Sequence, residues 1–173
     1  NVKRDNKLTI VGVANNWEPR KNLDFFINLA KQLPDAQINI VGNISWSQKI
    51  KCTSNIKLLG HITNPNRLSE IYTNADVYIN ASREETFGMT TIEALACGTP
   101  VIVNNATALP EIVTSDTGLI VDIDNIDAVI NAIHSITNSH INYHETCRNH
   151  VITHYSRKRM TDQYLNLYND ILK

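Results

Sequence analysis

The chain has 173 residues, which is enough for one domain with a sizeable core. Its hydrophobic content of 42% lies well above the range of disordered chains, and no apolar run is long enough to span a membrane. With 16 basic and 17 acidic residues the net charge is −1, so no strong field of one sign indicates nucleic acid or an anionic membrane as a partner.

Short apolar runs alternate with amphipathic segments along the chain. The former predict buried strands, and apolar residues at i, i+3 and i+4 predict helices. In chain order, strands are predicted at 8–13, 38–42, 56–59, 77–80, 101–103 and 118–121. Helices are predicted at 23–33, from near 65 to 75, before Gly98, at 126–133, around 151 and at 160–171, with a helical turn at 110–113. We therefore predict an α/β fold: a Rossmann-like, doubly wound parallel sheet of about six strands with helices on both faces.

The chain shows no repeat and no linker, so residues 1–173 are predicted to form a single domain. Residues 1–5 are charged and contain no signal peptide, and because no initiator Met is present we expect a piece of a longer protein. Cys52, Cys97 and Cys147 lack C-x-x-C spacing. Reduced thiols in a cytoplasmic protein are therefore the expectation.

Residues 82–103 (SREETFGMTTIEALACGTPVIV) join two predicted strands through a loop and a short helix. Thr90 or Thr91 is expected to cap this helix, with Glu93 in its first turn, where the helix dipole favours a carboxylate. Gly98 follows the last residue of the helical apolar pattern, so the helix is predicted to end there.

The start of this helix also predicts a ligand site. After Gly88, free N–H groups around 89–91 would bind an anion such as a diphosphate, and the hydroxyls of Thr90 and Thr91 can add hydrogen bonds. Glu85 lies on the loop before the helix, so Glu85 and Glu93 can border one cleft. Such a cleft would lie at the carboxyl end of a strand, where ligands bind in open α/β sheets.

The segment from Glu85 to Val101 reads E-x-F-G-x-x-x-x-E-A-x-A-C-G-T-P-V. It resembles the signature of the family 4 retaining glycosyltransferases, which have two Rossmann-like domains and the GT-B fold. Further segments match the same family, at 12–23, 40–43, 58–62, 109–113 and 117–121. The resemblance covers only the C-terminal, donor-binding half of such enzymes, and the N-terminal acceptor domain is absent.

The resemblance implies a role for each of several residues. Glu93 should accept hydrogen bonds from the donor ribose, and Glu85, the candidate catalytic residue, should face the donor sugar. Lys21 should neutralise the diphosphate together with Arg20, at the helix start formed by Gly88, Met89, Thr90 and Thr91. His61 belongs to the segment that faces the nucleobase. A carboxylate suits the ribose because charge-assisted hydrogen bonds are short and strong.

Three positions complicate this assignment. Asn15 occupies the place where the family usually carries an Arg, which is why Arg20 is considered as its substitute. Thr107 and Ala108 occupy the place where the family prefers Gly-Gly. Glu84 directly precedes Glu85 and leaves a one-residue ambiguity in the register of the first glutamate.

By resemblance, the chain is the donor-binding domain of a retaining, metal-independent transferase in polysaccharide or glycoconjugate synthesis. It would use a nucleotide-diphosphate sugar and no further cofactor, and in the full enzyme it would close on an acceptor domain that binds a glycan or lipid-linked acceptor, with peripheral association at the inner face of the membrane. Alone, it should bind nucleotide but transfer no sugar.

Metal sites are not expected. Asp122-Ile123-Asp124 spells a D-x-D motif, but Asp124 is expected to cap the next helix. The pairs His140/His144 and His150/His154 share helical faces without a zinc motif and are expected to be exposed.

Three other functions remain open. A GT-B-like nucleotide-sugar epimerase would keep the fold and change the reaction. A non-catalytic nucleotide- or glycan-binding module would need neither glutamate. A dinucleotide-binding domain is disfavoured, because Gly12 stands alone without G-x-G-x-x-G.

Overall fold

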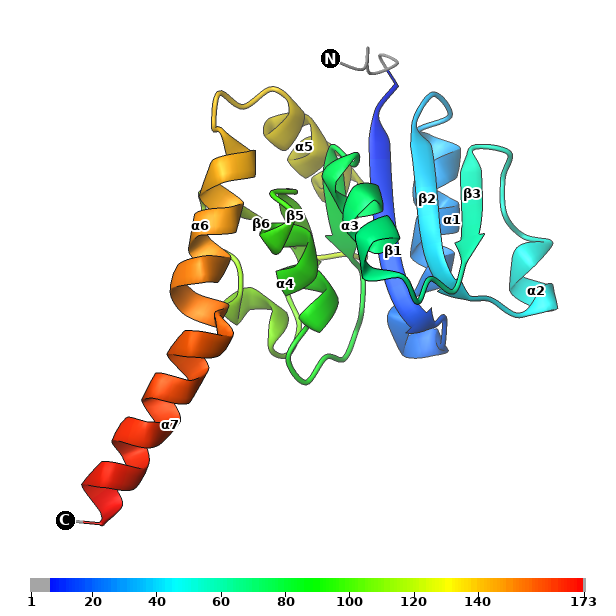
Figure 1. Ribbon diagram of the computed structural model, residues 1–173. Helices are drawn as coiled ribbons and strands as arrows, with labels where there is room; N and C mark the ends of the chain where they lie inside the picture. Colours follow the sequence, from blue (N-terminus) through cyan, green and yellow to red (C-terminus); the bar gives the residue numbers. More distant parts are fainter. Residues whose placement is uncertain (1–6, 173) are drawn as a thin grey trace.

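Six parallel strands form one sheet, in the order β3-β2-β1-β4-β5-β6 (Figure 1). The computed structural model describes residues 7–172, so the charged start lies outside the described residues. The strands are β1 (Thr9–Asn16), β2 (Gln37–Asn43), β3 (Ile56–Gly60), β4 (Val77–Asn80), β5 (Val101–Asn104) and β6 (Gly118–Val121). The predicted doubly wound parallel sheet is confirmed.

Helices cover both faces of this sheet. On one face α1 (Leu23–Gln32) and α5 (Ile126–Thr137) pack on side chains such as Ile10 and Ile79. On the other face α3 (Pro65–Thr73), α4 (Met89–Ala96) and α6 (Tyr143–Tyr155) pack on Val11 and Tyr78. Because both faces are covered, every residue of β4 and β5 is buried, which explains their continuous apolar sequences.

Four further elements lie within residues 7–172. They are the short helices η1 (Pro19–Lys21), α2 (Trp46–Lys49) and η2 (Leu109–Glu111), and the final helix α7 (Arg157–Ile171). No residue of α7 is buried, and in Figure 1 it extends away from the sheet. Its large apolar side chains are therefore exposed: Met160, Tyr164, Leu165, Leu167, Tyr168 and Ile171. Within residues 7–172, no helix combines the length and the apolar character needed to cross a bilayer.

Gly42 creates an irregularity where β1 meets β2. The pairing of the two strands shifts between Val13 and Asn16, and Gly42 has φ +124°. A Cβ atom at Gly42 would lie 1.8 Å from the carbonyl oxygen of Ala14, so only glycine lets the two backbones approach this closely. Beyond this point Trp17 is locked in place, because its backbone N–H donates to Asn43 O (3.0 Å) and its indole N–H to Val41 O (3.0 Å). The end of β1 is thus held rigidly at the point where the chain turns into η1.

β1 and β4 are neighbours at the centre of the sheet, although two strands separate them in the sequence. After β1 the chain continues towards β2 and β3, and after β4 it continues in the opposite direction towards β5 and β6. A crevice at the carboxyl ends of such a strand pair is the usual ligand site of doubly wound sheets.

Candidate functional site

Lys21 and Glu85 meet across this crevice. Lys21 ends η1, which follows β1, and Glu85 lies in the loop that follows β4. The Lys21 ammonium donates to Glu85 Oε1, and the two side chains are only 17% and 13% exposed. Because surrounding protein shields this ion pair from water, it interacts more strongly than an exposed surface pair would.

Buried asparagines fix the loop that carries Glu85. At the end of β4, Asn80 accepts a hydrogen bond from the Ser82 N–H (3.1 Å), and at the end of β5, Asn104 donates to Ser82 O (3.0 Å). The Ser82 hydroxyl in turn donates to Glu85 Oε1 (3.1 Å). The carboxylate of Glu85 is therefore positioned by groups that the sheet itself holds.

Thr107 contacts the same loop from the other side. It lies between β5 and η2, and its hydroxyl oxygen accepts a hydrogen bond from the Glu85 backbone N–H (2.9 Å). Its φ is +50°, a left-handed conformation that is a genuine outlier for a β-branched residue and costs about 1–3 kcal/mol. Sequence analysis marked this position only as a departure from Gly-Gly and missed its contact with Glu85.

The start of α4 differs from the prediction. The helix begins at Met89, its N-cap is Gly88 (φ +86°), and no side chain caps it, so the expected cap by Thr90 or Thr91 is wrong. A Cβ at Gly88 would lie 2.9 Å from both Leu109 and Ile112, which explains why glycine occupies the tight turn. Glu93 accordingly lies beyond the first turn, which contains no acidic residue.

The two threonines of α4 have different surroundings. Thr91 is fully buried, its N–H donates to Gly88 O (2.9 Å) and its hydroxyl accepts from the Asn80 amide (3.1 Å). Thr91 thus stabilises the turn into α4, and the expectation that its N–H group is free is wrong. Thr90 is half-buried and accepts a hydrogen bond from the Tyr78 hydroxyl (2.8 Å). Among residues 7–172 nothing accepts the N–H groups of Met89 and Thr90, so these two remain available to an anion.

Glu93 lies half-buried between α3 and α4. The Tyr72 hydroxyl donates to Glu93 Oε2 (3.2 Å), and Tyr72 itself is buried at the end of α3. Burial raises the pKa of the Glu93 carboxyl, and the hydrogen bond from Tyr72 partly offsets this increase. Nothing in the sequence pattern indicated Tyr72 as a partner, because its position on α3 reads as an ordinary core residue.

Two other predicted site residues are not brought into contact with this group. Arg20 is exposed, and its side chain pairs with Glu18 (2.8 Å). Its backbone carbonyl accepts a hydrogen bond from the Arg83 N–H (2.8 Å), in the loop that also carries Glu85. His61 is exposed just after β3, at the same edge of the sheet but two strands away from β1. Their roles in binding remain predictions.

Asp124 has a partner other than the predicted one. Asn125, not Asp124, caps α5 by accepting the Ala128 N–H (3.1 Å). Asp124 instead forms a two-pronged ion pair with Arg83 of the site loop, at 2.7 and 2.9 Å. The D-x-D motif is thus used in a salt bridge, and within residues 7–172 no group of three or more His, Cys, Asp or Glu side chains is arranged to hold a metal ion.

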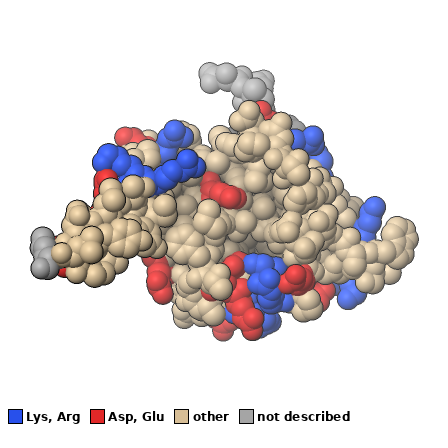
Figure 2. Space-filling view, turned by 60° about the horizontal axis from the view of Figure 1, so that its bottom comes forward, with Lys and Arg blue, Asp and Glu red and all other residues tan. Residues whose placement is uncertain are grey.

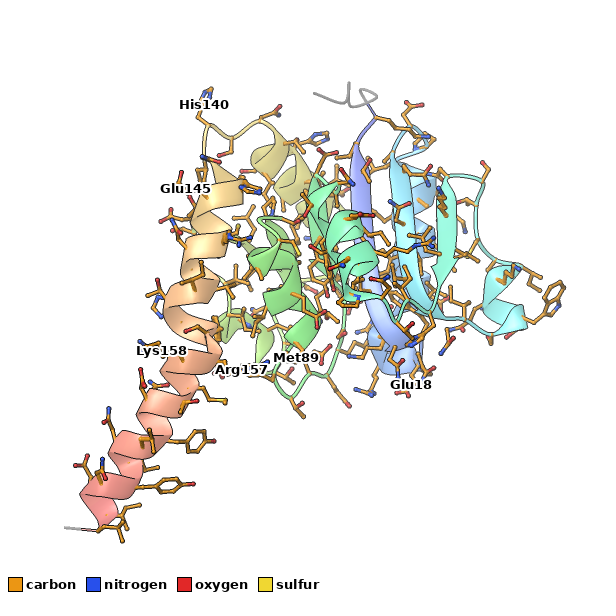
Figure 3. All side chains as sticks on the ribbon, in the orientation of Figure 1. Glu18, Met89, His140, Glu145, Arg157 and Lys158 are labelled. Atoms are coloured by element: carbon orange, nitrogen blue, oxygen red, sulfur yellow. The ribbon has the colours of Figure 1, made fainter. Side chains whose placement is uncertain are left out.

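The edge that carries the strand ends has mixed charge. In Figure 3, Met89 and Glu18 both lie at this edge, and Figure 2, which turns it forward, shows acidic and basic side chains interleaved there. The space between the ends of β1 and β4, lined in part by Trp17, Lys21 and Ser82, is too narrow to admit a water molecule. A wider open groove of about 320 Å³ lies beside it, lined by residues including Asn16, Asn43 and Gln48.

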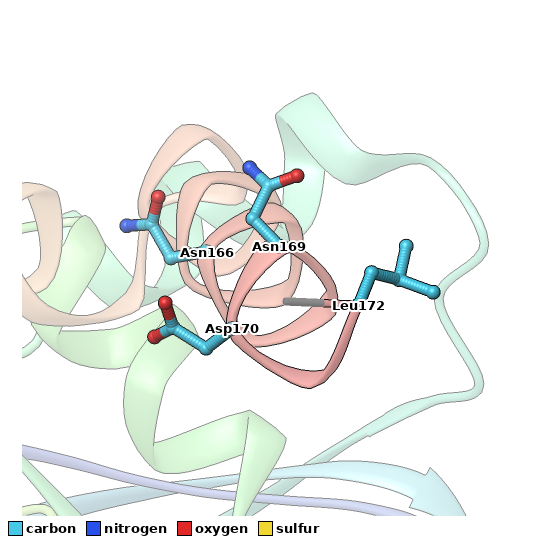
Figure 4. Close-up of a pocket in the computed structure, with 4 residues that line it drawn as sticks. All are labelled: Asn166, Asn169, Asp170 and Leu172. Carbon is cyan, nitrogen blue, oxygen red and sulfur yellow. The ribbon is translucent and has the colours of Figure 1, made fainter.

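A further hollow lies at the end of α7, far from these residues. Figure 4 shows that Asn166, Asn169, Asp170 and Leu172 line it, from the last turns of that helix and the residue that follows. Because no second element helps to enclose it, we assign it no binding role.

Comparison with known proteins adds a second, independent observation. The family model described as glycosyl transferases group 1 matches residues 1–154. An uncharacterized 41.2 kDa protein in the cps region of Klebsiella pneumoniae is 28% identical over 97% of this chain, which spans 48% of that protein. A GDP-mannose-dependent alpha-(1-6)-phosphatidylinositol dimannoside mannosyltransferase of Mycobacterium tuberculosis is 28% identical over 73% of this chain and 34% of its own length.

Two solved structures support the same grouping. Sucrose-phosphate synthase from Thermosynechococcus elongatus superposes with a TM-score of 0.81 and 25% identity, covering 95% of this chain and 46% of that one. A glycosyltransferase from Rickettsia africae gives a TM-score of 0.81 and 25% identity over 98% of this chain and 49% of its own. The chain therefore spans about half the length of each.

Proposed function

The chain belongs to the glycosyl transferases group 1 family, and from this premise we propose that it is the donor-binding domain of a retaining, metal-independent glycosyltransferase. The observation that carries the proposal is the Lys21–Glu85 ion pair at the carboxyl ends of β1 and β4. Glu85 lies on the loop that leads to the N-terminus of α4, which no side chain caps. A cation, a carboxylate and two N–H groups without a partner, all near the carboxyl ends of the central strands, support the proposal, because doubly wound sheets bind ligands at that edge.

These groups match the needs of glycosyl transfer from a nucleotide diphosphate. Negative charge accumulates on the leaving diphosphate, and the Lys21 ammonium together with the N–H groups of Met89 and Thr90 would stabilise it. In this structure Lys21 is held by Glu85, so donor binding would draw the ammonium towards the phosphates and free the Glu85 carboxylate to face the sugar. Glu93, with Oε1 not engaged by Tyr72, would accept hydrogen bonds from the ribose.

The rest of the enzyme would supply the acceptor site. Because the chain spans about half the length of its relatives, we propose a second, N-terminal domain that closes over the crevice. The exposed apolar face of α7 would pack against that part of the protein. The mycobacterial relative is named for GDP-mannose and a phosphatidylinositol mannoside, which favours a glycan or lipid-linked acceptor here. A cytoplasmic location, at the inner face of a membrane, remains a prediction.

Nucleotide binding tests the assignment directly. We expect calorimetric titration of the intact protein with UDP, GDP, ADP and their sugar conjugates to reveal saturable binding of one nucleotide. Glu93→Ala should weaken it by about 10- to 100-fold, because hydrogen bonds to a charged group are worth about 1.5–3 kcal/mol. Glu84→Ala removes an exposed carboxylate nearby and is the matched control. Wild-type affinity in a folded Glu93→Ala variant would rule out the ribose role.

The pH dependence of binding should report on Tyr72. Glu93 must be ionised to accept from the ribose, so affinity should fall as the pH drops through its raised pKa. Tyr72→Phe removes the hydrogen bond that lowers this pKa, so the midpoint of the loss should move to higher pH. Dissociation constants measured between about pH 4.5 and 8 give the midpoint. Tyr155→Phe is the control, because it removes a hydroxyl that donates to the Glu111 carbonyl and not to Glu93. A midpoint that is unchanged or lower in Tyr72→Phe would contradict the prediction.

A further inference from the structure

Thr107 adopts a conformation that its own side chain disfavours. Among residues 7–172 only Asn22 and Thr107 are non-glycine residues with positive φ, and asparagine tolerates this region whereas a β-branched residue does not. The surrounding loop imposes the conformation. Asn105 N–H donates to Val121 O (2.8 Å) and Ala106 N–H to Asn104 O (2.8 Å), which ties the segment before Thr107 to the ends of β5 and β6.

The segment after Thr107 is fixed as well. Leu109 is fully buried and its N–H donates to Ala106 O (3.3 Å), so the backbone on both sides of Thr107 is held. A glycine would occupy this position without strain, but it has no hydroxyl. The Thr107 hydroxyl oxygen is the acceptor of the hydrogen bond from the Glu85 N–H.

Glu85 is thereby fixed at both ends. Its backbone is bonded to Thr107, and its carboxylate is bonded to Lys21 and Ser82. Ser82 and Glu85 belong to one loop, whereas Thr107 comes from the next crossover along the sheet, 22 residues away. Thr107 thus connects the carboxylate to a second, independent part of the scaffold.

We propose that Thr107 is a positioning residue that fixes the Glu85 backbone, and through it the carboxylate, against the donor sugar. This inference rests on the proposed function, since it gives Glu85 a donor to face. A shift of the carboxylate by about 1 Å can lower a reaction rate by about 100-fold, so one hydrogen bond at the backbone of such a residue has a measurable effect on turnover.

Three substitutions separate the hydroxyl from the backbone strain. Thr107→Val keeps the branched shape and loses the hydroxyl, Thr107→Ser keeps the hydroxyl, and Thr107→Gly removes both hydroxyl and strain. Each is made in the intact protein and examined by hydrogen exchange of the Glu85 amide and by steady-state kinetics with the nucleotide sugar. We expect the Val and Gly variants to lose exchange protection at Glu85 and to fall about 10- to 100-fold in kcat, with donor KM within about 3-fold. The Ser variant should restore both.

The stability of the variants distinguishes positioning from simple support of the fold. Thr107→Gly should have a melting temperature equal to or above that of the wild type while its kcat falls, which a purely structural role would not produce. An unprotected Glu85 amide in the wild type, or a protected one in Thr107→Val, would overturn the hydrogen bond and leave the proposed function intact. Full kcat in Thr107→Val would overturn the positioning role. If nucleotide binds but no variant, wild type included, transfers sugar, the amide result still decides the hydrogen bond and the role in turnover is rejected.

Discussion

Glu85→Gln is expected to lower kcat of the intact enzyme by about 100- to 1,000-fold, with a much smaller change in donor KM. Glutamine has nearly the same shape and can still accept from the Ser82 hydroxyl, while its backbone N–H can still donate to Thr107. What is lost is the negative charge that pairs with Lys21 and that, under the proposed function, would face the donor sugar. The measurement is single-turnover and steady-state transfer with a labelled nucleotide sugar.

Glu84→Gln is the matched control for this prediction. Glu84 is adjacent in sequence and carries the same charge, but it is exposed, whereas Glu85 is shielded and held by Lys21 and Ser82. Its substitution should leave kcat within about 2-fold, since an exposed surface charge contributes little. A large loss in Glu84→Gln with little loss in Glu85→Gln would show that the register of the first glutamate has been assigned one residue too late.

Gly42→Ala is expected to reduce the free energy of unfolding by about 4 kcal/mol or more, or to prevent folding altogether. The new Cβ would lie 1.8 Å from the Ala14 carbonyl oxygen, and because the β2 backbone fixes the position of the Cβ, the clash is relieved only by separating β1 from β2. The residue would also be forced into φ +124°, which L side chains rarely adopt. Urea unfolding followed by circular dichroism measures the effect.

Gly60→Ala separates the two causes. Gly60 also has positive φ, at +70°, but a Cβ there has no neighbouring atom within 4 Å. Its substitution should cost only the conformational strain, about 1–2 kcal/mol. If the two variants lose equal stability, the close approach of the Ala14 carbonyl is not what makes glycine necessary at Gly42.

The sequence predicted the sheet well because its strands depend on local composition. β4 and β5 are buried on both faces, so they appear as unbroken apolar runs, and their observed bounds differ from the predicted ones by at most one residue. The start of α4 was harder to predict. Thr90 and Thr91 are good capping residues, but the turn at Gly88 packs under Leu109 and Ile112, and this tertiary contact decides where the helix begins.

The site was predictable as a set of residue types and much less as a set of contacts. Glu85, Glu93 and Lys21 were named from the motif, yet their partners come from segments far away in sequence. Lys21 and Glu85 are 64 residues apart, and Glu93 bonds to Tyr72, a residue whose position on α3 indicates only burial. Asp124 was likewise predicted to cap a helix from its position in the sequence. In the structure it pairs with Arg83, which lies on another crossover and offers a charged partner.

The strand order also determines when the site can form during folding. The chain makes two sets of three strands, β1 to β3 and β4 to β6, and within each set every strand pairs with a strand next to it in sequence. Only the β1–β4 pairing joins the sets, and it must close the longest loop of the sheet, which makes it the entropically most expensive step. Lys21 belongs to the first set and Glu85 to the second, so their ion pair forms only after this step. Recovery of nucleotide binding after dilution from denaturant would thus report the docking of the two halves, not the formation of either.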